Sequence, residues 1–274
     1  MKIFFKKAIS DFKQKIIFLK YKNTLPINPL HDDIYIVEFP KSGVTWLSFL
    51  LGTINLKTNN LANHVTYYNH HKWVIDVHQV AGFKIQRHFS NTFIKSHSAF
   101  NPYYYFTIYL IRNPFDVMVS YYNFAISRYG YTKDFDSFVK DKNMGINAWV
   151  EHVKSWHHGK RHVQRIHFIR YEELKDNPER SLQDLYINLG ITVSTDILHQ
   201  SIADCDVSKM QNTEAHYQTF NHNYIGGFVG SKGKLAKENI LTDDIKKIII
   251  KCAHHQILFF YPELLTLQDN DAVI

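Results

Sequence analysis

A short turn early in the chain has the residue types that bind phosphate. The segment FPKSGVTWL, residues 39–47, begins at the last residue of the apolar run IYIVEF. Gly43 lets the backbone approach an anion closely, Lys41 adds a positive charge, and Ser42 and Thr45 supply hydroxyls. A Walker loop has its lysine after the last glycine, whereas Lys41 comes before Gly43, and the chain contains no GKS or GKT. The segment therefore predicts an anion site unlike that of nucleoside-triphosphate kinases.

A second candidate anion site follows another apolar run, at IRNPFDVMVS. Arg112 comes at the end of the run, Asn113 is a good helix cap, and Pro114 suits the first helical turn. Ser120 follows about two helical turns later. An arginine fork with a hydroxyl is suited to a phosphate group. Together the two segments predict a ligand that carries two separate phosphate groups.

Composition narrows the possible partners. The chain has 274 residues, 45% apolar and 21% charged, with a formal net charge of +7. This excess of positive charge favours anionic partners, but we find no basic stripe or reading motif typical of nucleic-acid binding. Two cysteines are too few for a disulfide framework. No metal site is predicted, because the densest histidine group has no cysteine or paired carboxylate beside it: His152, His157, His158 and His162.

The first thirty residues differ from the rest and are predicted to form a basic amphipathic helix and a linker. Lysines fill the positions between apolar residues at helical spacing: Phe5, Ile9, Phe12, Ile16 and Leu19. The apolar stretches are too short and too broken by lysine for a membrane span. Residues 1–22 could lie on an anionic membrane surface or pack on the domain, and both alternatives stay open. Residues 31–274 are predicted to be one domain.

From Ile34 the chain alternates strand-like and helix-like segments, which predicts an α/β fold with a central parallel sheet flanked by helices. The expected strands are residues 34–39, 82–86, 91–97, 105–112 and 165–170. The expected helices are residues 43–54, 113–124, 146–160 and 181–190, the last ending at Gly190. Residues 211–230 have few periodic signals and are expected to form a lid. The aromatic and histidine side chains at helical spacing in the third helix are expected to be core: Trp149, His152 and Trp156.

These segments together resemble the sulfotransferases that use 3′-phosphoadenosine 5′-phosphosulfate (PAPS). FPKSGVTW and IRNPFDVMVSYY resemble the two nucleotide-binding segments of that family, and FIKSHSAF resembles the Lys-Thr-His segment of its cytosolic-type branch. Further on, WVEHVKSWHHGK and IHFIRYEELKDNP resemble a helix–strand–helix segment of the family. The resemblance extends in order from about Ile34 to about His254.

The resemblance implies an in-line transfer of a sulfuryl group from PAPS to a hydroxyl, with adenosine 3′,5′-bisphosphate (PAP) as the product and no metal. It implies His97 as general base, Lys41 at the bond that breaks, and Lys95 at the transferring group. The implied cofactor-binding residues are Lys41, Ser42, Gly43, Val44, Thr45, Trp46, Arg112, Ser120, Tyr171, Ser231, Lys232 and Gly233. The P-loop-like turn would hold the 5′-phosphosulfate, Arg112 and Ser120 the 3′-phosphate, and Trp46 and Tyr171 the adenine.

The chain departs from the family pattern in its later part. Ser231 stands where an arginine is expected, although Lys232 and Gly233 fit, and Val207 stands where the family often has an aromatic residue. The alternative is therefore a catalytically degenerate nucleotide-binding protein at a membrane surface. The acceptor is left open among a lipid, a saccharide and a small alcohol or phenol. The expected location is cytoplasmic, with possible peripheral contact at the inner face of a membrane.

Overall fold

A computed structural model describes residues 21, 24–160, 165–220 and 237–265. Five parallel strands form a central sheet in the order β2-β3-β1-β4-β5. The strands are β1 (Ile34–Glu38), β2 (Val74–Asp76), β3 (Phe93–Ser96), β4 (Phe106–Ile111) and β5 (Arg165–Arg170). The predicted α/β class and parallel sheet are confirmed.

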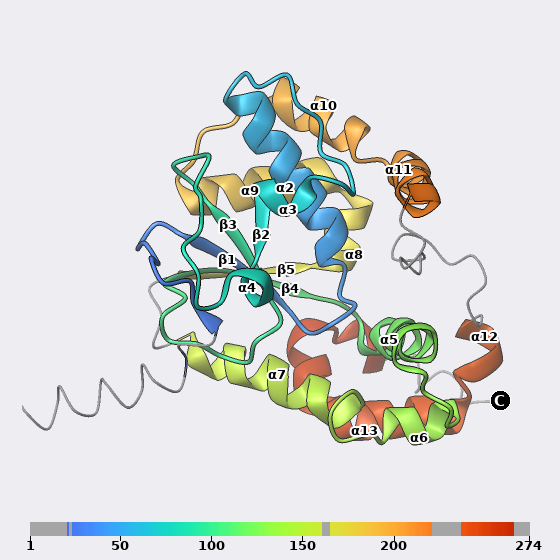
Figure 1. The fold of residues 1–274 in the computed structure, drawn as a ribbon. Helices are drawn as coiled ribbons and strands as arrows, with labels where there is room; N and C mark the ends of the chain where they lie inside the picture. Colours follow the sequence, from blue (N-terminus) through green and yellow to red (C-terminus); the bar gives the residue numbers. More distant parts are fainter. Residues whose placement is uncertain (1–20, 22–23, 161–164, 221–236, 266–274) are drawn as a thin grey trace, which may run out of the picture.

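Helices cover both faces of the sheet (Figure 1). On one face lie α2 (Val44–Thr58), α9 (Pro178–Leu189) and α10 (Thr195–Asp204), and on the other lie α5 (Pro114–Tyr129), α7 (Ile146–Gly159) and α13 (Asp243–Phe260). The shorter helices are α3 (His70–Trp73), α4 (Val77–Val80), α6 (Phe135–Val139), α8 (Tyr171–Asp176) and α12 (Lys237–Ile240). This double covering explains why the central strands are continuously apolar, since a strand between two helical layers has no solvent face.

Side chains alternate between the two layers along each strand. In β1, Ile34 and Ile36 pack with α2 and α9, whereas Tyr35 and Val37 pack with α5 and α7. Glu38 therefore faces the same layer as Ile36, because successive side chains point to opposite faces. This alternation determines which polar side chains at the strand ends lie on the same face of the sheet.

Most predicted elements are present, but one expected strand is absent and one short strand was not predicted. Residues 82–86 form no strand: Gly82 has φ +79°, and the backbone of Phe83 and Ile85 bonds to residues 27 and 28 instead of a neighbouring strand. The strand beside β3 is β2, whose three residues were too few to give a periodic signal. Residues 211–220 belong to the helix α11 (Val207–Phe220), and residues 221–230 lie outside the described part.

The segment before the sheet packs on the domain. Leu25 is buried in the core, and Asp33 pairs with Arg87 at 2.6 Å. The predicted amphipathic helix lies outside the described residues except for Tyr21, so the division at residue 30 stays a prediction. In the described ranges, no helix is both long and apolar enough to cross a membrane.

Candidate active site at the carboxyl ends of the strands

The predicted site residues follow the carboxyl ends of neighbouring strands. The turn after β1 leads to α2 on one face of the sheet, and the turn after β4 leads to α5 on the opposite face. In open parallel sheets, such a point of divergence between adjacent strands forms a crevice where ligands bind. The end of β3 lies on the other side of β1. The topology therefore brings three predicted segments to one edge of the sheet.

The turn after β1 has an unusual backbone that is held by local bonds. Lys41 and Gly43 have positive φ angles of 77° and 112°. The buried Ser42 hydroxyl donates to the carbonyl of Phe39 at 2.8 Å. A Cβ atom on Gly43 would lie 2.4 Å from the ring of Tyr171, so glycine is required there both by the φ angle and by the contact.

Two of the amides predicted to hold the 5′-phosphosulfate have partners within the protein. The N–H of Val44, the first residue of α2, donates to Glu38 Oε2 at 2.8 Å. The N–H of Trp46 donates to the Gly43 carbonyl at 3.1 Å. A ligand that uses the Val44 amide must therefore share it with, or take it from, Glu38.

Glu38 is a buried carboxylate in this site that the sequence interpretation missed. Its side chain is 2% exposed, and its Oε1 lies 3.7 Å from Nδ1 of His97. Burial raises the pKa of Glu38 to about 7, although the Val44 N–H bond and three nearby cations oppose the shift: Lys41, Lys95 and Arg112. A single charged residue within the otherwise apolar run IYIVEF was the available signal.

His97 directly follows β3, with a ring edge that turns inward. Nδ1 is buried and has no hydrogen-bond partner among the described residues, whereas the whole side chain is 30% exposed. Burial, with a smaller effect of Lys95, lowers the pKa of His97 to about 4, so the ring is neutral near pH 7. A neutral imidazole can accept a proton, as a general base must.

Lys95 shares a face with His97 because the two residues are two positions apart along the strand. Its ammonium pairs with Asp76 Oδ2 of β2 at 2.8 Å, and both side chains are partly buried. Lys95 also lies opposite Ile36 of β1. The ion pair fixes the ammonium at the edge of the sheet that contains His97 and Glu38.

Arg112 belongs to the second candidate phosphate segment and contacts the first one. Its Nη1 donates to the Lys41 carbonyl at 3.3 Å, and its guanidinium lies 4.5 Å from the centre of the Tyr171 ring. Its Nε is buried and has no hydrogen-bond partner in the described part of the chain. A buried N–H of this kind fits an anionic ligand, because an unpaired charged donor is costly. Ser120 lies half-buried in α5.

Aromatic rings border the turn. Trp46 and Tyr171 meet edge to face at 6.0 Å, and the Trp46 indole donates to the Cys205 carbonyl at 3.0 Å. The ammonium of Lys41 lies 4.5 Å from the centre of the Phe124 ring of α5. The side chain of Thr45 is half-buried in the first turn of α2.

Behind the site, three side chains of α7 are buried as expected. Trp149 and Trp156 are fully buried. His152 is 8% exposed, its Nδ1 contacts the Tyr109 hydroxyl at 2.8 Å, and its Nε2 contacts the His97 carbonyl at 3.3 Å. His152 therefore supports the backbone of His97, a role that the expectation of core packing did not include.

The remaining predicted residues are not placed in this cluster. Ser231, Lys232 and Gly233 lie outside the described residues, and Val207 is an exposed residue at the start of α11. In the described part of the chain, no three His, Cys, Asp or Glu side chains are grouped to hold a metal ion.

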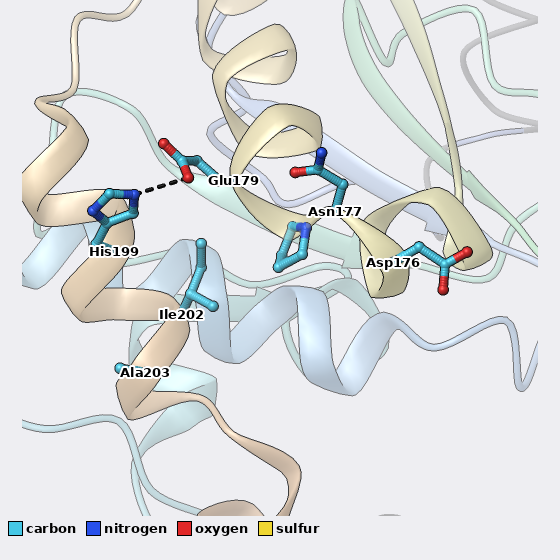
Figure 2. A pocket seen from close by; sticks show the side chains of 7 residues that line it. Asp176, Asn177, Glu179, His199, Ile202 and Ala203 are labelled. Atoms are coloured by element: carbon cyan, nitrogen blue, oxygen red, sulfur yellow. Dashed lines mark ion pairs between the residues drawn. The ribbon is translucent and has the colours of Figure 1, made fainter.

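A separate pocket of about 330 Å³ lies between α8, α9 and α10 (Figure 2). Asp176, Asn177 and Glu179 line one side, and Ile202 and Ala203 line the other, with His199 paired to Glu179 at 2.8 Å. None of the predicted site residues lines it. Its charged side chains are mainly carboxylates, which do not suit a phosphorylated ligand.

The profile of the family described as "Sulfotransferase domain" matches residues 31–251. Bovine sulfotransferase 1E1 is 31% identical over 202 residues, which are 66% of this chain and 66% of that protein. Human sulfotransferase 2B1 is 30% identical over 205 residues, 68% of this chain and 54% of that protein. The matched segment thus spans about two thirds of the bovine relative and about half of the human one. The chain belongs to the sulfotransferase domain family, and the predicted cytosolic-type family is confirmed.

Solved structures agree on the fold. Mouse sulfotransferase SULT7A1, complexed with PAP, has a TM-score of 0.60 at 17% identity and covers 94% of each chain. Retinol dehydratase, in complex with androsterone and inactive cofactor PAP, has a TM-score of 0.63 at 17% identity, covering 88% of this chain and 85% of that chain. These two structures confirm the fold, and the family match confirms the predicted sulfotransferase class.

Proposed function

We propose that this chain transfers a sulfuryl group from PAPS to an acceptor hydroxyl and releases PAP. Family membership supports the reaction class. The observation that carries the proposal for this chain is the grouping of Lys41, His97 and Arg112 at the carboxyl ends of β1, β3 and β4, which are neighbours in the sheet. PAPS supplies the activated sulfuryl group, and the protein contributes position and charge.

Two positively charged groups would hold the ends of the nucleotide. Arg112, with its unpaired Nε and with Ser120 on the following helix, would bind the 3′-phosphate. The turn from Lys41 to Trp46, including the Val44 and Thr45 amides at the start of α2, would bind the 5′-phosphosulfate, since helix N-termini favour anions. Tyr171 and Trp46 would contact adenine. Ser231, Lys232 and Gly233 are proposed as further 3′-phosphate contacts on the resemblance alone.

His97 would take the proton of the acceptor hydroxyl as that oxygen attacks sulfur. Support comes from its neutral ring, its partial exposure, and its fixed backbone carbonyl beside His152. Lys95, held by Asp76, would stabilise charge on the transferring group. Lys41 would stabilise the oxygen of the departing nucleotide; its flexible four-carbon stem lets the ammonium move from Phe124 toward that atom.

The acceptor is proposed as a hydroxyl-bearing lipid, saccharide, or small alcohol or phenol. Retinol dehydratase, one of the structural neighbours, has been solved in complex with androsterone and with retinol, so an acceptor panel should include a steroid and a retinoid alcohol. We propose a cytoplasmic location, with residues 1–22 as a possible peripheral membrane contact. A deletion that tests this contact should end before Thr24, because Leu25 is buried in the core.

The test is transfer of labelled sulfate from PAPS to a panel of alcohols, phenols, sterols and saccharides. We expect labelled product and stoichiometric PAP with the wild-type protein. His97→Gln should lower the rate by about 10²- to 10⁴-fold, the usual contribution of a general base, while PAP affinity changes little. Product formation that is unchanged in His97→Gln would refute the proposed base. A protein that binds PAP but transfers to no acceptor would support the catalytically degenerate alternative.

A further inference from the structure

The carboxylate of Glu38 lies between the first amide of α2, in the candidate phosphate-binding turn, and the ring of His97, the proposed general base. Oε2 accepts the Val44 N–H at 2.8 Å, which fixes the carboxylate at the start of α2. Oε1 faces Nδ1 of His97 at 3.7 Å. Both Glu38 and Nδ1 are buried, so bulk water does not separate them freely.

We propose that Glu38 is a positioning residue: its carboxylate accepts a hydrogen bond from Nδ1–H of His97, which keeps that proton on Nδ1 and leaves the Nε2 lone pair to receive the proton of the acceptor hydroxyl. This inference rests on the proposed function, because it assigns a partner to the proposed base. The observed separation is longer than a hydrogen bond, and contacts of this kind in ligand-free sites commonly shorten when substrate binds.

The neutral imidazole has one proton, and its surroundings decide which nitrogen carries it. A lone pair on Nδ1 would face the carboxylate oxygen and be repelled, whereas an N–H there would be attracted. Within hydrogen-bond geometry Nδ1 has no partner in the described ranges, although the backbone of Glu38 also interacts with the ring and raises its pKa. His152 holds the carbonyl of His97, and its contact with Tyr109 fixes His152 in turn, so the ring has a firm backbone support.

The same carboxylate also adjusts the basicity of the ring. Burial and Lys95 lower the pKa of His97, which weakens it as a base. Asp76 and the backbone of Glu38 oppose that effect, and a negative charge on the Glu38 side chain would add to them, because an opposite charge favours the protonated imidazole. The charged and titratable groups around the pair are Lys41 from the turn, Lys95 from β3, Asp76 from β2, His78 from α4, Tyr109 from β4, Arg112 after β4, and His152 from α7.

Glu38→Gln provides a sharp test because its amide oxygen can still accept the hydrogen bond from the Val44 N–H at the start of α2. If the amide oxygen of glutamine accepts from Val44, its NH₂ group faces Nδ1 and donates to it. The variant therefore favours the opposite tautomer, with the proton on Nε2. We expect the rate of PAP release with the mixed acceptor panel to fall at least tenfold, and PAP affinity to be retained.

The measurement is ¹⁵N NMR of protein labelled at its histidines. The pH is 8, where the Glu38 carboxyl is mostly ionised. The signals of His97 are identified as those that disappear in the spectrum of His97→Gln. Wild-type His97 should carry its proton on Nδ1, and Glu38→Gln should move it to Nε2. Glu179→Gln, which removes a carboxylate paired with His199, is the matched control and should leave the tautomer and rate unchanged.

The wild-type spectrum decides the matter even if Glu38→Gln fails to fold. A proton on Nε2 in the wild-type protein would overturn the inference, as would an unchanged tautomer or unchanged rate in a folded Glu38→Gln. Binding of PAP by the wild-type protein is a separate readout. Failure of that binding would refute the proposed function, whereas PAP binding with the wrong tautomer would refute only the role of Glu38.

Discussion

At the scale of single residues, charge pairs determine where the candidate catalytic groups point. Lys95 is held by Asp76 of the neighbouring strand, and His97 faces Glu38 of the strand on the other side. Each of these carboxylates is partly or fully buried, so the contacts act in a medium where charge interactions are stronger than in water. The roles proposed for Lys95 and His97 therefore depend on two acidic neighbours.

Asp76→Asn should reduce the rate of transfer about three- to tenfold and leave PAP affinity nearly unchanged. The asparagine cannot hold the Lys95 ammonium by charge, so the lysine is less well placed at the transferring group. The check is steady-state kinetics together with PAP titration.

The matched control is Asp204→Asn, since Asp204 pairs with Lys57 at 3.0 Å in a more exposed position away from the strand ends. It should leave the rate unchanged. An Asp76→Asn protein that is as fast as the wild type would remove Asp76 from the account.

At the scale of elements, the two turns after β1 and β4 place the anion-binding groups. The turn after β1 depends on Gly43, whose positive φ angle and close contact with Tyr171 leave no room for a side chain. The turn after β4 begins α5 with the Asn113 cap and Pro114 at its first position. These features follow local rules, which is why the sequence predicted both turns.

Gly43→Ala should lower the free energy of unfolding by about 2–3 kcal/mol and weaken PAP binding, because the Cβ atom must displace the Tyr171 ring. Gly190→Ala is the matched control. Gly190 also has a positive φ angle, 70°, but no atom lies within 4 Å of the added Cβ. It should cost only about 1 kcal/mol and leave binding intact. Equal losses in urea unfolding of the two variants would contradict this explanation.

The sequence predicted the four longer strands and both turns, but it missed Glu38, Asp76 and the support from His152. The turns are visible in short motifs because glycine, proline and capping residues act locally. The missed contacts join β1 to β3, β2 to β3, and α7 to β3, so they depend on strand order and register. Nothing in a linear pattern specifies that Asp76 lies opposite Lys95.

At the scale of the whole molecule, stability and site chemistry share the same buried ionisable groups. Burial lowers the pKa of His70, His97 and His152 to about 4 each. Burial raises the pKa of Glu38 to about 7. The three histidines are neutral in the folded protein at pH values where they are protonated in the unfolded chain.

Stability should therefore fall as the pH is lowered from about 6.5 to about 4. A histidine with a lowered folded pKa contributes stability that is present above its unfolded pKa and lost as the pH falls through the folded pKa. Glu38 acts in the opposite direction, since its contribution is lost as the pH rises toward 7. Three histidines against one carboxyl leave a net uptake of up to two protons on unfolding, so stability should fall by up to about 2.7 kcal/mol per pH unit in the middle of this range.

Urea unfolding at pH 6.5, 5.5 and 4.5 measures this slope. His152→Gln keeps an acceptor for Tyr109 and a donor for the His97 carbonyl but does not titrate, so its slope should be smaller by about one proton. Equal slopes, or stability that rises toward pH 4.5, would contradict the assignment of buried neutral histidines.

The central claim is a site at the strand ends that recognises both phosphates of the nucleotide. Calorimetric titration with PAP, with adenosine 5′-phosphate as the comparison ligand and Arg112→Ala as the variant, tests it most directly. We predict that wild-type protein binds PAP at least tenfold more tightly than adenosine 5′-phosphate, and that Arg112→Ala removes this preference, because a lost hydrogen bond to a charged group costs about 1.5–3 kcal/mol. No binding of PAP, or equal binding of the two nucleotides by the wild-type protein, would contradict the claim.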